Sequence, residues 1–543
     1  MKNLKNFSSV LLITLGVLFL ASCGPKKQIV KTDPSKAQGY YEQGRKAFEK
    51  GKYDNALLNF NQAVRFDPSQ ARFYYHRGLT HFKLKNNSSA LVDFDRVVTM
   101  RRASSAVYNN RGLIYQTMGE HPAAVRDFTK AISLDKKNGL AYYNRGASYY
   151  HLKNYSKAVS DISTAIRMGS ANRSTYYRMR GMCYMEMNSY QKALTDLDMA
   201  VIQNPRYTLA YNSRGDLHFK LKRYSGAVKD YTKSINLAPY NSEIYLKRAD
   251  AYRAMRNYSK AESDYSSVAA MEPKNPVPYV KMGDMYAVKS PEKAVDYYTE
   301  AIKRKSDANY YSKRAQVYFS LKEYENARED FTKAINLEPS NGRFYQGRAH
   351  VYFTEKNYNA SIADYTKAET LGYKTTKTYT NRGIAYAELG QNQKAINDFN
   401  TLLAKYPRNT YITYKRGTAY MAMGQYKEAI EDFTLAIKYK NGNYPAYTER
   451  GLAYMYLNEW DLAKLDFEKS YTLRGNNPTT NLYLSAYYWA YRKDMDRSLS
   501  YLRRALTLGY RDIDALHNVD KVGYFFRGLI AMTRFKNMVK GYR

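Results

Sequence analysis

The sequence predicts an all-α protein in which about 14 helix hairpins stack into a solenoid. Three observations support this fold class: a small residue recurs with a nearly constant period, apolar residues surround it at helical spacing, and turn-forming residues separate the units. The period is 34 or 35 residues, with one step of 32. The recurring positions are Gly44, Gly78, Gly112, Gly146, Gly181, Gly215, Ala249, Gly283, Ala315, Ala349, Gly383, Gly417, Gly451 and Ala486.

The segment Thr208–Asn241 shows how one unit forms a hairpin. Tyr211 and Gly215 are four residues apart, so they share one face of a first helix. Ala227 lies in a second helix, and Pro239 ends that helix because it has no backbone N–H to donate. A single hairpin cannot bury its apolar faces alone, so neighbouring hairpins must stack.

This pattern resembles the tetratricopeptide repeat family over roughly residues 37–507, in 14 copies. The resemblance implies a right-handed α-solenoid with a concave inner groove. The last copy is degenerate, and residues 508–543 hold no further repeat. We expect them to form C-terminal capping helices over the exposed end of the stack. The apolar residues expected in this cap are Leu516, Val519, Phe525, Phe526, Leu529 and Phe535.

The eighth repeat is irregular. It is one residue short around Ser290-Pro291, and the step to the ninth repeat is the one of 32 residues. We therefore expect a tighter turn and a local break in regularity there.

A pair of charged positions recurs through the array. Arginine directly precedes the small residue in 11 repeats, and the same 11 repeats carry an aspartate in the second helix; the other three lack both. This coincidence predicts structural ion pairs between packed helices, such as Arg214 with Asp230 and Arg382 with Asp398. Pairing between neighbouring repeats, through Asp364, is the alternative. Such arginines are not counted as ligand-binding charge.

Residues 1–22 have the features of a lipoprotein signal peptide. Two lysines precede the apolar run Val10–Leu20, which is too short to span a bilayer. The run Leu20-Ala21-Ser22-Cys23 resembles the bacterial lipoprotein box. This resemblance implies that Cys23 is lipidated and becomes the first residue of the mature chain, with residues 23–36 as a tether. An ordinary soluble exported protein is the alternative.

The chain is strongly basic, with a net charge of +37 and a pI near 9.7. Residues 1–250 carry 40 basic and 18 acidic residues, against 37 and 28 in residues 251–500. Such charge favours nucleic acid or an anionic surface as a partner, but export argues against nucleic acid. Anionic cell-wall or surface polymers therefore remain an alternative partner. A solvated basic surface without a special partner is the simplest explanation.

Three adjacent repeats place an aspartate directly after the small residue: Asp216, Asp250 and Asp284. If the family geometry holds, these residues form an acidic strip in the groove, which we predict receives a basic segment of a partner. Solvated acids that balance nearby lysines are the alternative. Co-chaperone members of the family bind carboxylate tails through asparagine and lysine, but no repeat here has asparagine after the small residue.

No metal-ligand spacing, phosphate-binding glycine loop or nucleophile motif is found, so we expect no enzyme activity, metal or cofactor. The sequence predicts instead a lipid-anchored adaptor of a bacterial envelope that faces the periplasm and docks envelope proteins. Gly24 after Cys23 resembles sorting signals for the outer membrane. A lipoprotein component of a secretion or motility machine is a further possibility for this class.

Overall fold

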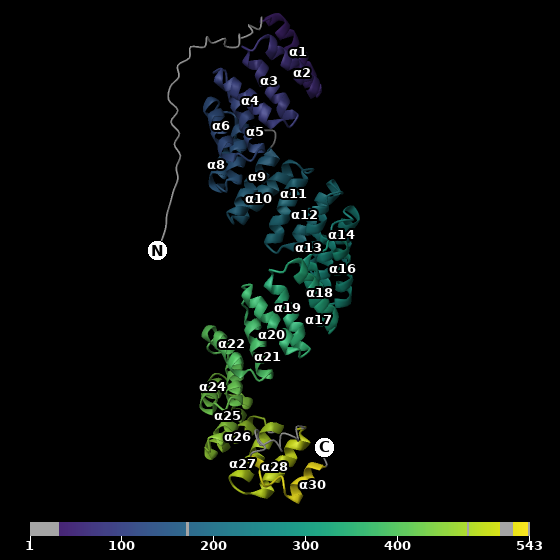
Figure 1. The fold of residues 1–543 in the computed structure, drawn as a ribbon. Coiled ribbons are helices and arrows are strands. Elements are labelled where there is room, and N and C mark those ends of the chain that lie inside the picture. Colours follow the sequence, from purple (N-terminus) through teal and green to yellow (C-terminus); the bar gives the residue numbers. More distant parts are fainter. Residues whose placement is uncertain (1–31, 170–172, 475–476, 511–524, 541–543) are drawn as a thin grey trace, which may run out of the picture. The chain divides into compact units, whose positions relative to one another are not determined.

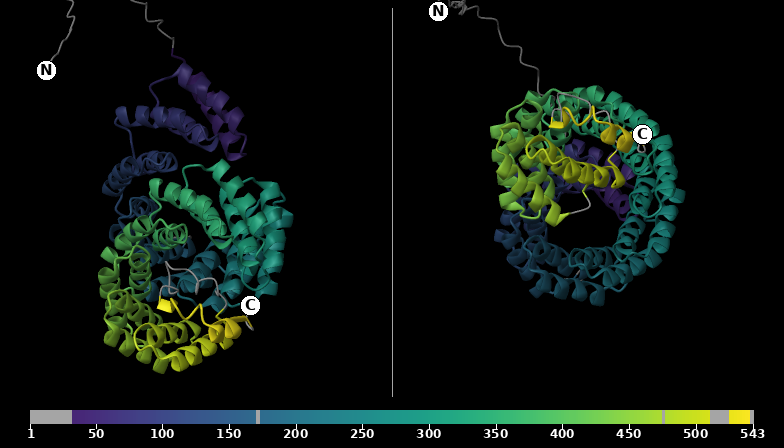
Figure 2. Two further views of the ribbon diagram at one scale, coloured as in Figure 1. Left: turned by 60° about the horizontal axis from the view of Figure 1, so that its bottom comes forward. Right: turned by 90° about the horizontal axis from the view of Figure 1, so that it is seen from below.

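The computed structural model describes residues 32–169, 173–474, 477–510 and 525–540. These residues form 29 α-helices and no strand (Figure 1), which confirms the predicted all-α class and its helix hairpins. The chain divides into two compact units, Met1–Met255 and Arg256–Arg543, called below the N-terminal and the C-terminal unit. Within each unit successive hairpins pack side by side (Figure 2).

Helices α1 to α28 alternate as the first and second helices of the 14 repeats. The N-terminal unit holds α1 (Pro34–Glu49), α2 (Tyr53–Phe66), α3 (Ala71–Lys83), α4 (Asn87–Thr99), α5 (Ser105–Thr117), α6 (His121–Leu134), α7 (Gly139–His151), α8 (Tyr155–Arg167), α9 (Arg173–Glu186), α10 (Tyr190–Gln203), α11 (Thr208–Lys220), α12 (Tyr224–Leu237) and α13 (Ser242–Ala254).

The C-terminal unit begins in the seventh repeat. It holds α14 (Tyr258–Met271), α15 (Val277–Tyr286), α16 (Pro291–Arg304), α17 (Ala308–Ser320), α18 (Tyr324–Leu337), α19 (Gly342–Thr354), α20 (Tyr358–Thr370), α21 (Thr376–Glu388), α22 (Asn392–Lys405), α23 (Thr410–Ala422), α24 (Tyr426–Tyr439), α25 (Tyr444–Tyr456), α26 (Trp460–Leu473), α27 (Pro478–Ala490), α28 (Met495–Thr507) and α30 (Thr533–Lys540).

The recurring small residue allows the two helices of a hairpin to approach closely. In the sixth repeat, a Cβ atom at Gly215 would lie 2.6 Å from Cε1 of Tyr231, whose ring is buried between α11 and α12. The turn between these helices places Lys222 in the left-handed region, with φ of 58°. Ile235 of α12 then packs with Ile244 of α13, so the core continues from one repeat into the next.

The two ends of the array differ in detail from the expectation. The first helix begins at Pro34, three residues before the expected start at residue 37. Proline suits the first helical position, and the side chain of Asp33 caps the helix by accepting from the backbone N–H of Lys36 at 3.0 Å. Residues 23–31 of the expected tether lie outside the described residues.

The C-terminal residues pack where a cap was expected. Phe525, Phe526, Leu529 and Phe535 are all buried in one cluster with apolar side chains of α25 to α28. The described part of this segment contains one α-helix, α30. Leu516 and Val519 lie outside the described residues.

The eighth repeat has the expected irregular turn. Its first helix, α15, has 10 residues, whereas α17 in the next repeat has 13. The backbone N–H of Ser290 donates to the carbonyl of Tyr286 at 2.9 Å, and no residue between α15 and α16 has a positive φ. The division between the two compact units falls earlier, at Met255–Arg256 in the seventh repeat.

Candidate functional site

The charged pairs of the repeats are ion pairs within single hairpins. Arg214 donates to Asp230 through Nε at 2.9 Å and through Nη2 at 2.6 Å. Arg382 and Asp398 repeat this arrangement at 2.9 and 2.7 Å. Asp364, the alternative partner, accepts instead from the arginine of its own repeat. The two parallel hydrogen bonds fix each guanidinium plane against the second helix.

The third nitrogen of these arginines makes a contact that the sequence analysis missed. Nη1 of Arg214 donates to Asp198 of the preceding repeat at 2.7 Å, and Nη1 of Arg382 donates to Thr366 at 3.2 Å. Each acceptor lies two residues after the second-helix aspartate, or after the residue that stands in its place in repeats 1 and 8. This recurring polar position in the sequence could have predicted the contact. The acceptors are Asn61, Asp95, Thr129, Ser163, Asp198, Thr232, Thr299, Thr332, Thr366, Asn400 and Thr434.

This third contact joins neighbouring repeats and leaves the arginines little capacity for a ligand. The hydrogen bonds that Arg214 donates to the Asp230 carboxylate raise the pKa of Arg214, with a further contribution from Asp198. Most of the guanidinium donors are therefore already used inside the array. The 11 arginine–aspartate positions and the third contact of each arginine are called the ladder below. The ladder is a scaffold that orients the first helices.

The predicted acidic strip carries its own lysines. Asp216 accepts from the hydroxyl of Tyr231 at 2.7 Å and from Nζ of Lys247 at 3.0 Å. Burial and the neighbouring Asp216 carboxylate together raise the pKa of Tyr231, so this hydroxyl keeps its proton and donates. Asp250 lies 3.4 Å from the guanidinium of Arg253 on the same helix.

Asp284 belongs to the C-terminal unit and repeats the arrangement of Asp216. It accepts from the hydroxyl of Tyr298 at 2.6 Å and from Nζ of Lys313 at 2.5 Å. A basic ligand must therefore compete with an internal lysine at both Asp216 and Asp284. Binding by the three aspartates remains a prediction.

A pocket opens between α11 and α13 at two of these aspartates. It has a volume of about 440 Å³ and is lined by Asp216, Phe219, Lys220, Tyr231, Lys247 and Asp250. The rings of Phe219 and Tyr231 supply an apolar surface, and charges of both signs surround it. Such a surface suits one apolar side chain of a protein segment whose neighbours are charged.

Glu449 is a partly buried acid that the sequence did not single out. It directly precedes the ladder arginine of α25, the position that Lys247 holds in α13. Burial raises the pKa of Glu449 to about 7, and its charge in turn contributes to the raised pKa values of Tyr414 and Tyr483. In the described part of the chain it forms no ion pair, so no lysine or arginine compensates its charge when it ionises.

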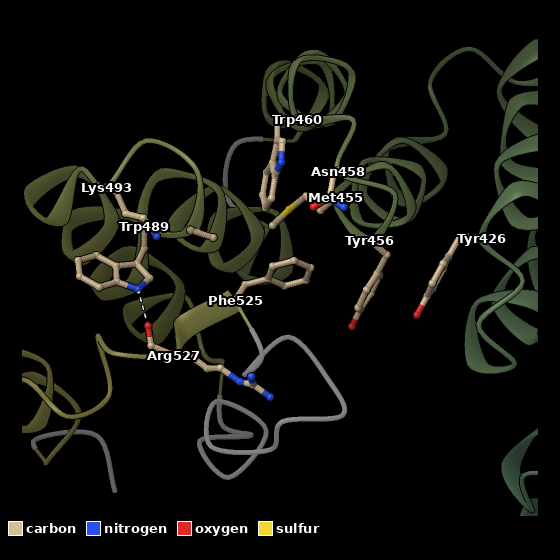
Figure 3. Close-up of a pocket in the computed structure, with 10 residues that line it drawn as sticks. Tyr426, Met455, Tyr456, Asn458, Trp460, Trp489, Lys493, Phe525 and Arg527 are labelled. Carbon is tan, nitrogen blue, oxygen red and sulfur yellow. Dashed lines mark hydrogen bonds between the residues drawn. The ribbon is translucent and has the colours of Figure 1, made fainter.

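A larger pocket lies near the C-terminal end (Figure 3). Its volume is about 630 Å³, and its lining includes both tryptophans of the chain, Trp460 and Trp489. Tyr426 and Tyr456 stack with ring centroids 4.6 Å apart, and Phe525 lies across from Tyr456 at 5.1 Å. The pocket can hold a flat apolar group, with the charged side chains of Lys493 and Arg527 at its margin.

The other predictions from the sequence concern the two cysteines, a membrane span and a metal site. Cys23 is outside the described residues. Among the residues that are described, no helix has the length and apolar character needed to cross a membrane, and no group of three or more potential metal ligands occurs. Cys183 is buried in α9, and burial raises the pKa of its thiol to about 12, so it is a packing residue.

Comparison with known families identifies the repeats. Models described as "TPR repeat" and "Tetratricopeptide repeat" match residues 44–85, 105–138, 178–242, 308–341, 342–371 and 380–447. Together these segments make up about half of the chain.

Similarity to individual proteins is more limited. A segment of 54 residues is 48% identical to "Translocon at the outer membrane of chloroplasts 64" of Pisum sativum, which covers 10% of this chain and 9% of that protein. The structure of a tetratricopeptide repeat protein from Parabacteroides merdae aligns with a TM-score of 0.39 and 18% identity. The alignment covers 46% of this chain and 99% of the Parabacteroides merdae chain. The structure of pilF of Pseudomonas aeruginosa aligns with a TM-score of 0.36 and 19% identity. The alignment covers 40% of this chain and 98% of pilF.

Proposed function

This chain belongs to the tetratricopeptide repeat family, and from that premise we propose that it is a lipid-anchored scaffold that holds protein partners at a bacterial envelope. The repeats indicate a protein-interaction scaffold. The anchor, the compartment and the groove as docking site are the parts that we propose.

The pocket between α11 and α13 carries the proposal of groove docking. Its two rings offer an apolar contact, while Asp216, Lys247 and Asp250 offer charges that can exchange their internal partners for those of a bound segment. The exchange costs little because these side chains are partly exposed, so their internal pairs are weak. Binding strength then comes from the apolar contact, and charge selects the partner.

The amino-terminal sequence supports the anchor. An apolar run of signal-peptide length ends at the box that contains Cys23, and α1 begins at Pro34. Only about ten residues would then separate the lipid from the first repeat. Holding the array at the membrane raises the local concentration of groove and partner, so weak docking becomes effective.

The anchor is tested with Cys23→Ser. We expect this variant to leave the membrane fraction or to accumulate as the uncleaved precursor, as measured by cell fractionation and intact mass. Cys183→Ser is the matched control and should stay in the membrane fraction. Membrane association of Cys23→Ser with an unchanged mature mass would exclude lipidation at this residue.

The groove is tested by neutralising Asp216, Asp250 and Asp284 together as Asp→Asn. Crosslinking in intact cells, followed by mass spectrometry, should show the loss of partners that the unchanged protein captures, while thermal unfolding stays within a few degrees. The control neutralises Asp54, Glu120 and Glu186, which are exposed and lie away from the groove pocket. Equal capture by both variants would leave the three aspartates as solvated acids and remove the groove strip from the proposal.

A further inference from the structure

The loops that join successive repeats of the N-terminal unit carry a row of cations. Each second helix ends, and the next first helix begins, at the same edge of the stack, because the two helices of every hairpin are antiparallel. From the end of α4 to the start of α11, nine exposed basic side chains lie at this edge, which is called the basic edge below. They are Arg96, Arg101, Arg102, Lys130, Lys136, Lys137, Arg167, Arg173 and Arg206.

Carboxylates are few at the basic edge. Within the described residues, none of the nine side chains forms an ion pair. Three acids lie near them: Asp95 and Asp198 pair with Arg111 and Arg214, each at 2.7 Å, and Asp135 accepts from the backbone N–H of Lys137 at 2.9 Å. The row is therefore a true excess of positive charge.

One inter-repeat junction of the C-terminal unit is neutralised locally. The last turn of α16 and the loop after it hold three consecutive cations, and each has a carboxylate within 4 Å. Lys303 and Arg304 pair with Glu300 at 2.7 and 2.8 Å, and Lys305 pairs with Asp307 at 3.2 Å. Basic loops of this array can thus be neutralised locally, and the basic edge is not.

Helix stability explains only part of the basic edge. A cation in the last turn of a helix interacts favourably with the helix dipole, which accounts for Arg96 and Arg167. Lys136 and Lys137 instead precede the start of α7, and Arg173 begins α9. Positive charge at a helix start is unfavourable. Arg173 is thus placed against the helix dipole, whereas Lys136 and Lys137 lie between the end of α6, which favours them, and the start of α7, which does not.

Exposed aliphatic side chains lie among the cations. Leu134 is 49% exposed, Leu140 48%, Met168 41% and Ile202 64%, and all four lie within one turn of the inter-repeat loops. Aliphatic groups beside lysine and arginine match the boundary between lipid headgroups and acyl chains of an anionic bilayer. Saccharide and single-stranded nucleic-acid sites use exposed aromatic rings for stacking. Among the described residues of this edge, from the end of α4 to Arg206, no aromatic side chain is exposed.

We propose that the basic edge rests on the surface of a membrane that contains anionic lipids. The cations contact lipid phosphates, and the aliphatic side chains enter the headgroup region. This inference goes beyond partner docking and uses the proposed anchor only to explain why the N-terminal unit is near a bilayer. A lipid anchor with a basic surface forms two signals, which together hold a protein more firmly than either does alone.

The test uses the mature full-length chain with Cys23→Ser, so that no acyl group contributes. Sedimentation with vesicles of phosphatidylglycerol and phosphatidylcholine should show binding that disappears with phosphatidylcholine alone or in 0.5 M salt. The edge variant carries Arg101→Gln, Arg102→Gln, Lys136→Gln and Lys137→Gln. Each cation at an anionic surface contributes roughly fivefold, so we expect this variant, which lacks four of them, to bind about 600-fold more weakly.

The matched control removes the same charge from ion-paired sites. It carries Lys303→Gln, Arg304→Gln, Lys305→Gln and Lys333→Gln and should bind within about threefold of the parent. Circular dichroism and thermal unfolding verify that both variants fold. Equal vesicle binding by the two variants overturns the proposal. Loss of binding to alginate or duplex DNA, with vesicle binding unchanged, would assign the edge to a soluble polyanion and overturn it as well. Because lipidation is absent throughout, failure here leaves the anchor proposal untouched.

Discussion

Repeats 8 and 11 of the C-terminal unit join their helices with different polar groups. In repeat 11 the guanidinium of Arg382 is buried and spans three elements, with Asp398 on α22 and both Thr366 and Glu369 on α20 of the preceding repeat. One side chain therefore connects the hairpin internally and to its neighbour.

Repeat 8 has Met282 and Tyr297 at the two ladder positions. Its hairpin is joined by the hydroxyl of Tyr298 on Asp284 at 2.6 Å. Its link to the preceding repeat is the carboxylate of Glu262, which accepts from Tyr297, from Tyr286 at 2.6 Å and from Lys293 at 2.7 Å.

The comparison shows that a repeat needs one polar link within the hairpin and one to its neighbour, but not a particular pair of residues. A buried arginine supplies the link within the hairpin and the link to the neighbouring repeat at once. Loss of the arginine or of its aspartate then leaves a buried charge without a partner. Tyrosine hydroxyls on carboxylates supply them separately at a more exposed location, so each loss should cost less. The following predictions test this difference.

The largest effect is expected from Arg382→Met. It leaves the buried carboxylate of Asp398 without its cation, and breaking a buried pair costs about 3–5 kcal/mol. Arg382→Met combined with Asp398→Leu should recover much of this loss. Urea unfolding followed by circular dichroism measures both variants, and Arg343→Met on an exposed site is the control. Additive losses in the double-mutant cycle would show that the two residues do not interact.

A smaller effect is expected from Glu262→Gln in repeat 8. The amide replaces a charged acceptor of three hydrogen bonds by a neutral one, which should cost about 1–3 kcal/mol. Glu292→Gln, an exposed site in the first turn of α16, should change stability by less than about 0.5 kcal/mol. A loss for Glu262→Gln as large as that for Arg382→Met would contradict the comparison.

The same residue predicts a pH dependence. Burial opposes ionisation of Glu262, but hydrogen bonds from Lys293, Tyr286 and Tyr297 outweigh it and lower the pKa of the carboxyl. A lowered pKa stabilises the folded chain above the unfolded value of about 4.3, and this stabilisation is lost as the pH falls through the folded value. The difference in thermal stability between the parent and Glu262→Gln should therefore be present at pH 7 and shrink as the pH falls below about 4.3. A difference that does not shrink there would rule out this electrostatic origin.

The smallest effect is expected from Asp198→Asn. Asp198 receives the inter-repeat bond of Arg214 at 2.7 Å, but its side chain is 47% exposed. Such pairs contribute less than about 1 kcal/mol and are weakened by salt. Repeat 11 already has an amide at this position, since Asn400 accepts from Arg416 of repeat 12 at 2.6 Å. Thermal unfolding at low and at high salt would reveal the small difference, and a loss of several kcal/mol would show that the inter-repeat bond needs a charge.

The candidate site was predicted only in part. The positions of Asp216, Asp250 and Asp284 could be predicted to share a phase of the repeat, because phase depends on sequence spacing alone. The lysines that neutralise two of them lie 31 and 29 residues away, in the following repeat. Many lysines satisfy such a spacing, and the packing of one repeat on the next selects the partner. For the same reason Glu449 was not recognised, since its isolation depends on the tyrosines that surround it.

The sequence by itself determined the repeat length, the two helices of each repeat and the joint occurrence of arginine and aspartate in 11 repeats, because the period and the joint loss of both residues in three repeats are local and repeated facts. It also predicts a signal peptide and lipidation at Cys23, and both stay predictions. The structure then selected Asp398 over Asp364 as the partner of Arg382. Only the tertiary structure decided which hydrogen-bond donor reaches the preceding repeat, which cations remain unpaired at the basic edge, and where the pockets open. These features depend on the distance and angle between stacked hairpins, and such distances arise from side-chain packing that no single repeat contains.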